Sequence, residues 1–165
     1  MDLRDSILDS WYRQTLIVRA VADRVTETTR RAKPSPDGWP LDHQLAHMHQ
    51  VRKGWIANIR PDVAAELGDA FTDGWTTPID DLDEIKRLLD QSGTAVARAF
   101  AECLDGGMSK VGGYDHPMLF MQHMVWHDGW HVGLIMLGLR LAGEEPSEEW
   151  EETNIWGHWR TEEWD

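Results

Sequence analysis

Apolar residues recur at three- and four-residue steps in four long segments of this chain, and prolines and glycines separate the segments. The segments cover about residues 3–31, 40–60, 78–103 and 117–142. This spacing places the apolar residues on one face of an α-helix, and no segment shows the strict apolar-polar alternation of a half-buried strand. The pattern predicts an all-α protein whose four long helices pack as a four-helix bundle.

Helix boundaries follow from the positions of the prolines. Pro40 and Pro117 suit the first position of the second and fourth helices, because proline has no N–H to leave unpaired there. Thr77 stands before Pro78 and is a suitable N-cap for the third helix. Residues 61–76 show no clear period and are predicted to be a loop.

The chain divides by charge into two regions. Residues 1–143 are predicted to be the four-helix bundle, whereas residues 144–165 hold nine acidic side chains and one arginine. This C-terminal extension is too aromatic for a disordered solvating segment. It holds Trp150, Ile155, Trp156, Trp159 and Trp164, and we expect it to pack on its own bundle or on a partner subunit through its tryptophans.

The formal net charge of −13 argues against nucleic-acid binding, because an acidic protein repels a phosphate backbone. The one basic cluster, formed by Arg30, Arg31 and Lys33, is short and is interpreted as a solvated helix end. We therefore expect no nucleic-acid partner.

The remaining composition is typical of a cytoplasmic protein. The single cysteine, Cys103, cannot form an intramolecular disulfide, and its apolar helical setting predicts a buried structural thiol. No stretch approaches the roughly twenty apolar residues that span a bilayer. We expect a cytoplasmic location and no membrane association.

Histidines are concentrated on the second and fourth predicted helices. His123, His127 and His131 are spaced by four residues, and since four residues rotate by about 400° they form a stripe on one helix face. An i,i+4 pair joined by a third imidazole from a neighbouring helix would hold a divalent metal and leave coordination positions open. Open positions are typical of a catalytic rather than a structural site.

The third ligand has two candidates on the second helix. His43 and His47 are four residues apart, and their spacing does not choose between them. His49 is turned by about 200° from His47 and points elsewhere. A single helical histidine is usually an ordinary core or surface residue, so a purely structural bundle is one alternative, but several histidines together favour a metal site. Neutral imidazoles suit Zn²⁺, Ni²⁺, Fe²⁺ or Cu²⁺.

Asp128 lies between the two spaced histidines and makes the segment similar to the zinc-protease pattern, with aspartate in place of glutamate. That pattern would make Asp128 a general base, but we rank it below the bundle site because Asp is shorter and Gly129 weakens the helix. We predict instead that Asp128 orients an imidazole or is an exposed helix charge. Trp126 and Trp130 are predicted to be core residues, of which one or two could wall a substrate pocket.

Three motifs resemble the DinB-like superfamily of bacterial four-helix-bundle metalloproteins. They are Trp39 before the second helix, Leu45-Ala46-His47-Met48 within it, and His127-x-x-x-His131-x-Gly133 in the fourth helix. The resemblance spans most of residues 3–143 and implies that His47, His127 and His131 are the metal ligands. The chain departs from the common family ending His-Arg-Gly-Gln, because Val132 and Leu134 replace the arginine and the glutamine.

The resemblance also implies a function. Characterised relatives include S-transferases and isomerases that use low-molecular-weight thiols such as bacillithiol or mycothiol, and such proteins are often homodimers. We therefore expect a homodimeric, divalent-metal-dependent transferase or hydrolase that holds Zn, Ni or Fe and activates a thiol or water toward a small-molecule substrate. The alternative is a non-catalytic metal- or ligand-binding protein of the stress-response or sensor type.

Overall fold

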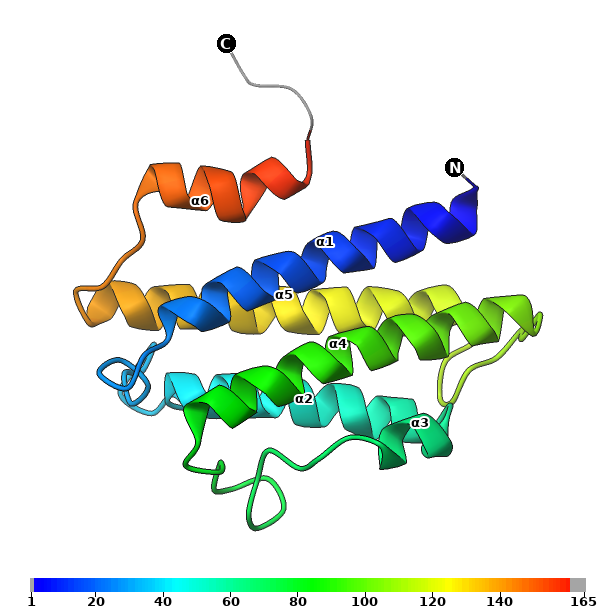
Figure 1. The fold of residues 1–165 in the computed structure, drawn as a ribbon, viewed down its shortest axis with the longest axis horizontal. Coiled ribbons are helices and arrows are strands. Elements are labelled where there is room, and N and C mark those ends of the chain that lie inside the picture. Colours follow the sequence, from blue (N-terminus) through cyan, green and yellow to red (C-terminus); the bar gives the residue numbers. More distant parts are fainter. Residues whose placement is uncertain (1, 161–165) are drawn as a thin grey trace.

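The computed structural model describes residues 2–160 and contains four long helices that pack side by side. Figure 1 shows α1, α2, α4 and α5 as the bundle, with α6 lying along α1. Within residues 2–160 there are two isolated β-bridges and no strand. The predicted all-α bundle is confirmed. Its elements are α1 (Leu3–Arg24), α2 (Leu41–Ala57), α3 (Pro61–Ala65), α4 (Leu82–Asp105), α5 (Pro117–Leu141), α6 (Glu148–Asn154) and the 3₁₀ helix η1 (Trp156–His158).

Side-chain caps fix the start of three helices. Asp2 accepts a hydrogen bond from the Asp5 amide at the start of α1, and Asp81 accepts one from the Glu84 amide at the start of α4. Ser147 accepts one from the Trp150 amide at the start of α6. Each cap satisfies one of the amides that a helix N-terminus leaves without an intrahelical partner.

The first helix ends at Arg24, seven residues before the predicted end. Val25 is extended, and the Thr26 amide donates to Thr29 Oγ1 over 2.9 Å. Threonine side chains of this kind offer the backbone hydrogen bonds that compete with helix continuation. Residues 27–31 consequently form a turn that leads into α2.

The segment between α2 and α4 also differs from the prediction. It contains the short helix α3, which residues 61–76 were not expected to hold. Thr77 is not the N-cap of α4, because its amide and hydroxyl both donate to Asp73 within the preceding turn. The N-cap is Asp81, so α4 begins at Leu82.

Two clusters of buried side chains form the core. One contains Val21, Leu45 and Ile85, and the other contains Trp11, Phe100 and Phe120. Each fully buried side chain of this size contributes roughly 1.5–3 kcal/mol. Both clusters draw on α1, α2, α4 and α5, so the four long helices are held together by a shared core.

Arg30 is buried, so the interpretation of its cluster as a solvated helix end is wrong. Its Nε donates to Asp42 Oδ2 over 3.0 Å, and its Nη1 donates to Glu27 and to the Asp80 carbonyl. Asp42 is itself fully buried, and the exposed Arg31 also pairs with it. These contacts tie the turn after α1 to the first turn of α2.

The C-terminal extension packs against α1 of its own chain. Ile155 is buried, and Trp150 is partly buried against the core, with the Arg24 guanidinium 5.8 Å from its ring. Arg13 donates to the His158 carbonyl. Trp156 and Trp159 are exposed, so they do not take part in this packing, and Trp164 lies outside the described residues.

α5 is apolar on nearly all sides, and its only charged residues are Asp128 and Arg140. One face enters the core, while the opposite face is open to solvent. Trp126 and Trp130 are 70% and 59% exposed, so the prediction that they are core residues is wrong. Among the described residues no helix combines the length and apolar content needed to cross a bilayer.

Candidate metal centre

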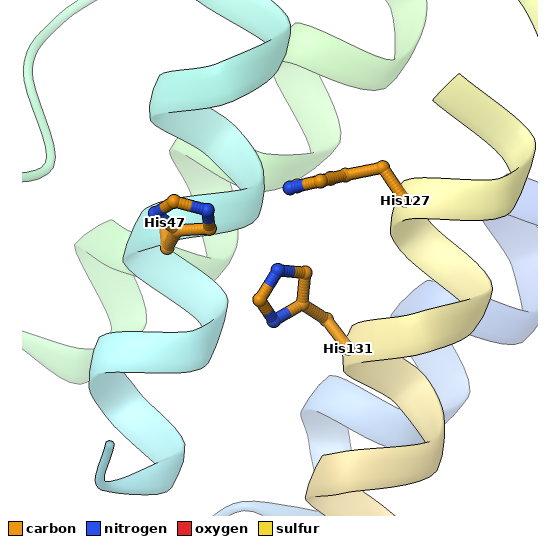
Figure 2. Close-up of side chains that lie close together, drawn as sticks. All are labelled: His47, His127 and His131. Atoms are coloured by element: carbon orange, nitrogen blue, oxygen red, sulfur yellow. The ribbon is translucent and has the colours of Figure 1, made fainter. Parts of the chain in front are cut away.

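Three histidines from two helices meet at the contact between α2 and α5. Figure 2 shows His47 on α2 facing His127 and His131 on α5, with the three rings turned into the gap between the helices. Each ring offers a nitrogen, and these nitrogens all lie within 4.8 Å of one another. Ring centroids are 5.3 Å apart for His47 and His127, 4.9 Å for His47 and His131, and 4.5 Å for His127 and His131.

Helix geometry accounts for this convergence. His127 and His131 lie one turn apart on the face of α5 that packs against α2. His47 lies near the middle of α2, where the two helices are in contact. Because both backbones are held by the core, the three rings are brought together without any loop.

Burial keeps two of these imidazoles neutral. Burial is the main cause that lowers the pKa of His47 to about 4 and that of His131 to about 3. Proximity to His127 lowers both further, because two protonated rings would repel each other. The lone pairs of His47 and His131 are therefore available at neutral pH.

Gln44 orients one of the three rings. Its side-chain oxygen is hydrogen-bonded to His131 Nδ1, and its side-chain amide donates to the Trp39 carbonyl over 3.3 Å. An amide oxygen can only accept, so Nδ1 carries the proton and Nε2 keeps the lone pair. Gln44 was missed in the sequence, although it lies three residues before His47 and so on the same face of α2.

Family comparison matches residues 2–161 to the DinB family model. The chain belongs to the DinB family. No functionally curated protein and no solved structure matched it. Membership confirms the resemblance found from the sequence and agrees with the all-α fold of this DinB-family protein.

The donor set of this DinB-family protein is consistent with a divalent metal site. His47 and His131 are neutral at pH 7, and the Gln44 contact leaves Nε2 of His131 as the free nitrogen. His127 Nδ1 is buried without a hydrogen-bond partner. Buried nitrogen atoms without partners are costly, and coordination by neutral imidazoles suits several divalent metals without choosing among them.

The other histidines are held outside the triad. His43 stacks on Trp39 with ring centroids 4.5 Å apart, and His123 is hydrogen-bonded through Nδ1 to the Tyr114 hydroxyl. His49 points away, as predicted, and its ring nitrogens lie 2.8 Å and 3.0 Å from the Leu88 and Gly68 carbonyls. The histidine cluster therefore contains His47 and not His43.

Asp128 takes a role that the sequence did not suggest. It is fully buried and paired with Arg52, so it is not an exposed helix charge. Its Oδ1 lies 3.9 Å from His127 Nδ1, which is beyond hydrogen-bond distance, so it does not orient that ring directly. The zinc-protease interpretation is not supported either, because both oxygens of the buried carboxylate are bonded to Arg52.

Aromatic side chains surround the opening of the site. Trp39 and Trp75 contact the His47 ring, with centroids 4.8 Å and 5.5 Å away. At the two positions where the chain departs from the family ending, Val132 packs against the core and Leu134 lines a cleft beside His131. Cys103 is buried elsewhere in the bundle, as predicted, and burial raises the pKa of its thiol.

Proposed function

We propose that this DinB-family protein is a metal-dependent transferase or hydrolase. His47, His127 and His131 would hold a divalent metal, which would supply the Lewis acidity that makes a low-molecular-weight thiol or a water molecule a nucleophile toward a small electrophile. The observation that carries the proposal is the convergence of three imidazole nitrogens within 4.8 Å from two separate helices. Zn, Ni and Fe are the candidate metals.

The metal would act as a Lewis acid that lowers the pKa of a bound thiol or water. The protein residues prepare the site for it. Neutral His47 and His131 add no positive charge of their own, Gln44 fixes the ring of His131, and three protein ligands leave positions for a substrate. Trp39 and Trp75 cover the His47 ring and reduce its contact with water.

Metal analysis of the purified full-length chain tests the site. We expect the wild type to contain a divalent metal and Zn²⁺ or Ni²⁺ to raise its melting temperature, because a ligand that binds the folded state stabilises it. His127→Ala and His131→Ala should abolish both effects. His116→Ala is the matched control, since His116 is an exposed histidine before α5 and outside the triad.

The wild type and the same variants also distinguish an enzyme from a protein that only binds metal. A wild type without metal, whose melting temperature neither ion raises, would disprove the proposal. Metal binding accompanied by consumption of a thiol or hydrolysis of a substrate, both lost in His127→Ala, supports catalysis. Metal binding without either reaction across a panel of thiols and electrophiles would favour the non-catalytic alternative.

We also propose that the protein is a homodimer that pairs through the exposed face of α5. This face presents Leu119, Trp126, Leu137 and Leu141 without a charged side chain among them. Nothing lies within 4 Å of a Cβ placed on Gly129 or Gly133 of the same helix, so a partner helix has room to approach. Each copy carries a net charge of −13, so two copies repel each other. An interface formed by this apolar face would bring the fewest like charges together.

A further inference from the structure

A cleft of about 330 Å³ opens beside the histidine triad. Trp39, which precedes α2, and Trp130 of α5 line it, and both indoles are about half exposed. Gln44 and His131 also line it, so one proposed metal ligand is part of its wall. A molecule in the cleft would contact the His131 ring.

Residues that line the cleft also contact the proposed metal ligands. Trp39 stacks on His43 and contacts the His47 ring, and its carbonyl accepts from Gln44. Gln44 in turn holds His131. Whatever binds against Trp39 is therefore adjacent to two of the three proposed ligands.

The loop that carries Trp39 is stiff. Pro34, Pro36 and Pro40 restrict its backbone, and the Gly38 amide closes a turn onto the Ser35 carbonyl over 3.0 Å. A Cβ at Gly38 would lie 2.8 Å from Ser35 Oγ and 3.1 Å from Pro34 Cγ, so only glycine fits this turn without displacement. A wall that is rigid before binding loses little entropy when a ligand arrives.

The charge of the cleft limits what it can hold. Asp37 is the one charged side chain that lines it, and Leu134 adds apolar surface. Indole faces favour flat apolar groups and attract cations through the ring quadrupole. In the metal-free protein an anion would find no positively charged side chain in the lining and would be repelled by Asp37.

We propose that this cleft binds the organic part of the substrate, and that its lining, considered without the charge of a bound metal, favours a flat group that is uncharged or cationic over an anionic one. This role in catalysis rests on the function proposed above, whereas the selectivity for the group rests on the cleft alone. Such a group would contact the two indoles, with its reactive end toward His131.

Three small probes of similar shape test the selectivity by isothermal titration calorimetry on the purified full-length protein with a chelator present, because a bound metal would itself attract an anion and repel a cation. They are benzyltrimethylammonium, benzyl alcohol and benzenesulfonate. We expect the cation to bind at least fivefold more tightly than the sulfonate, with the alcohol between them. Asp37→Asn should weaken binding of the cation and leave binding of the alcohol unchanged.

Tryptophan variants show where on the protein the cationic probe binds. Trp130→Ala should weaken binding of the cation at least fivefold, while Trp156→Ala should leave it within twofold, since Trp156 is similarly exposed but lies on the tail. Trp126→Ala distinguishes the cleft from the open face of α5. If it weakened binding as much as Trp130→Ala, or if the sulfonate bound as well as the cation, the proposal would be overturned.

The metal content of every variant is measured before the chelator is added, so that failure of one proposal can be told apart from failure of the other. Loss of probe selectivity in a protein that contained metal before chelation would overturn the cleft proposal and leave the metal site intact. Probe selectivity in a wild type that contained no metal before chelation would support the cleft's ligand class and overturn the proposed metal-dependent function.

Discussion

Arg52 on α2 and Asp128 on α5 form a two-pronged ion pair in the interior of the bundle. Arg52 Nε lies 3.3 Å from Asp128 Oδ1, and Nη2 lies 2.6 Å from Oδ2. Arg52 also donates to the Leu89 carbonyl and lies 5.2 Å from the Trp11 ring, so it contacts both core clusters. Asp128 directly follows His127, and the pair thus connects α2 to α5 beside the proposed metal ligands.

Removal of one partner of this ion pair should strongly destabilise the protein. Asp128→Ala is expected to lower the free energy of unfolding by about 3–5 kcal/mol, because it leaves the Arg52 guanidinium buried without its partner. The double variant Arg52→Met and Asp128→Leu should recover much of this loss. Urea denaturation measures both. The exposed Arg19–Asp90 pair is the control, and Asp90→Ala should cost about 1 kcal/mol or less.

Gln44 should control metal affinity without binding the metal. Gln44→Ala removes the acceptor that orients the His131 ring, and such contacts typically contribute 10–100-fold to metal affinity. Gln44→Glu keeps an oxygen acceptor and should bind metal within a few-fold of the wild type. Competition with a chelator gives the affinities. Gln50→Ala, which removes a contact to Asp69 away from the triad, should have no effect.

The helices were predictable because each buries an apolar face, and this shows directly as periodicity. The ends of the helices were less predictable. After α1, for example, the Thr29 side chain accepts a hydrogen bond from the Thr26 amide, and the periodicity of apolar residues does not reveal such contacts. The exposure of Trp126 also could not be predicted. A helix that is apolar all round does not indicate which of its faces the rest of the chain covers.

The site was predictable in part for a similar reason. The spacing of His127 and His131 places both on one face of α5, whatever that face contacts. The choice between His43 and His47 depends on the rotation of α2 against α5, which only packing decides. The role of Asp128 depends on Arg52, which is 76 residues earlier in the chain, so no local pattern could predict it.

The stability of the metal-free protein should fall in mild acid because of the triad. Unfolded histidines titrate near pH 6.5, whereas the pKa values of folded His47 and His131 are about 4 and about 3. As the pH falls below 6.5, the unfolded state takes up protons that the folded state refuses, so unfolding becomes easier. Stability attributable to these groups is fully present above pH 6.5 and is lost progressively down to about pH 4 for His47 and about pH 3 for His131.

Urea denaturation between pH 7 and pH 4.5 with a chelator present checks this dependence. The double variant His47→Gln and His131→Gln should show a shallower loss of stability, with up to about two fewer protons taken up on unfolding. Equal slopes in the two proteins would show that these histidines are not neutral in the folded state.

Trp150 should anchor the C-terminal extension. Its partly buried ring packs against the core and lies near the Arg24 guanidinium. Trp150→Ala is expected to lower the free energy of unfolding by about 1–3 kcal/mol, since it removes packing at a site that is not fully enclosed. Trp156→Ala should change stability by less than about 0.5 kcal/mol because that ring is exposed. A larger loss for Trp156→Ala would contradict the observed packing.

The exposed face of α5 should determine the oligomeric state. Trp126→Lys and Leu137→Lys each place a charge in the proposed interface and should convert a dimer into a monomer of 19.0 kDa in sedimentation experiments. Tyr12→Lys is the control, because Tyr12 is an aromatic residue of α1 with 60% exposure on another helix. Added salt should strengthen the wild-type dimer, since it screens the repulsion between two acidic chains. A wild type that sediments as a monomer at micromolar concentration would rule out this interface.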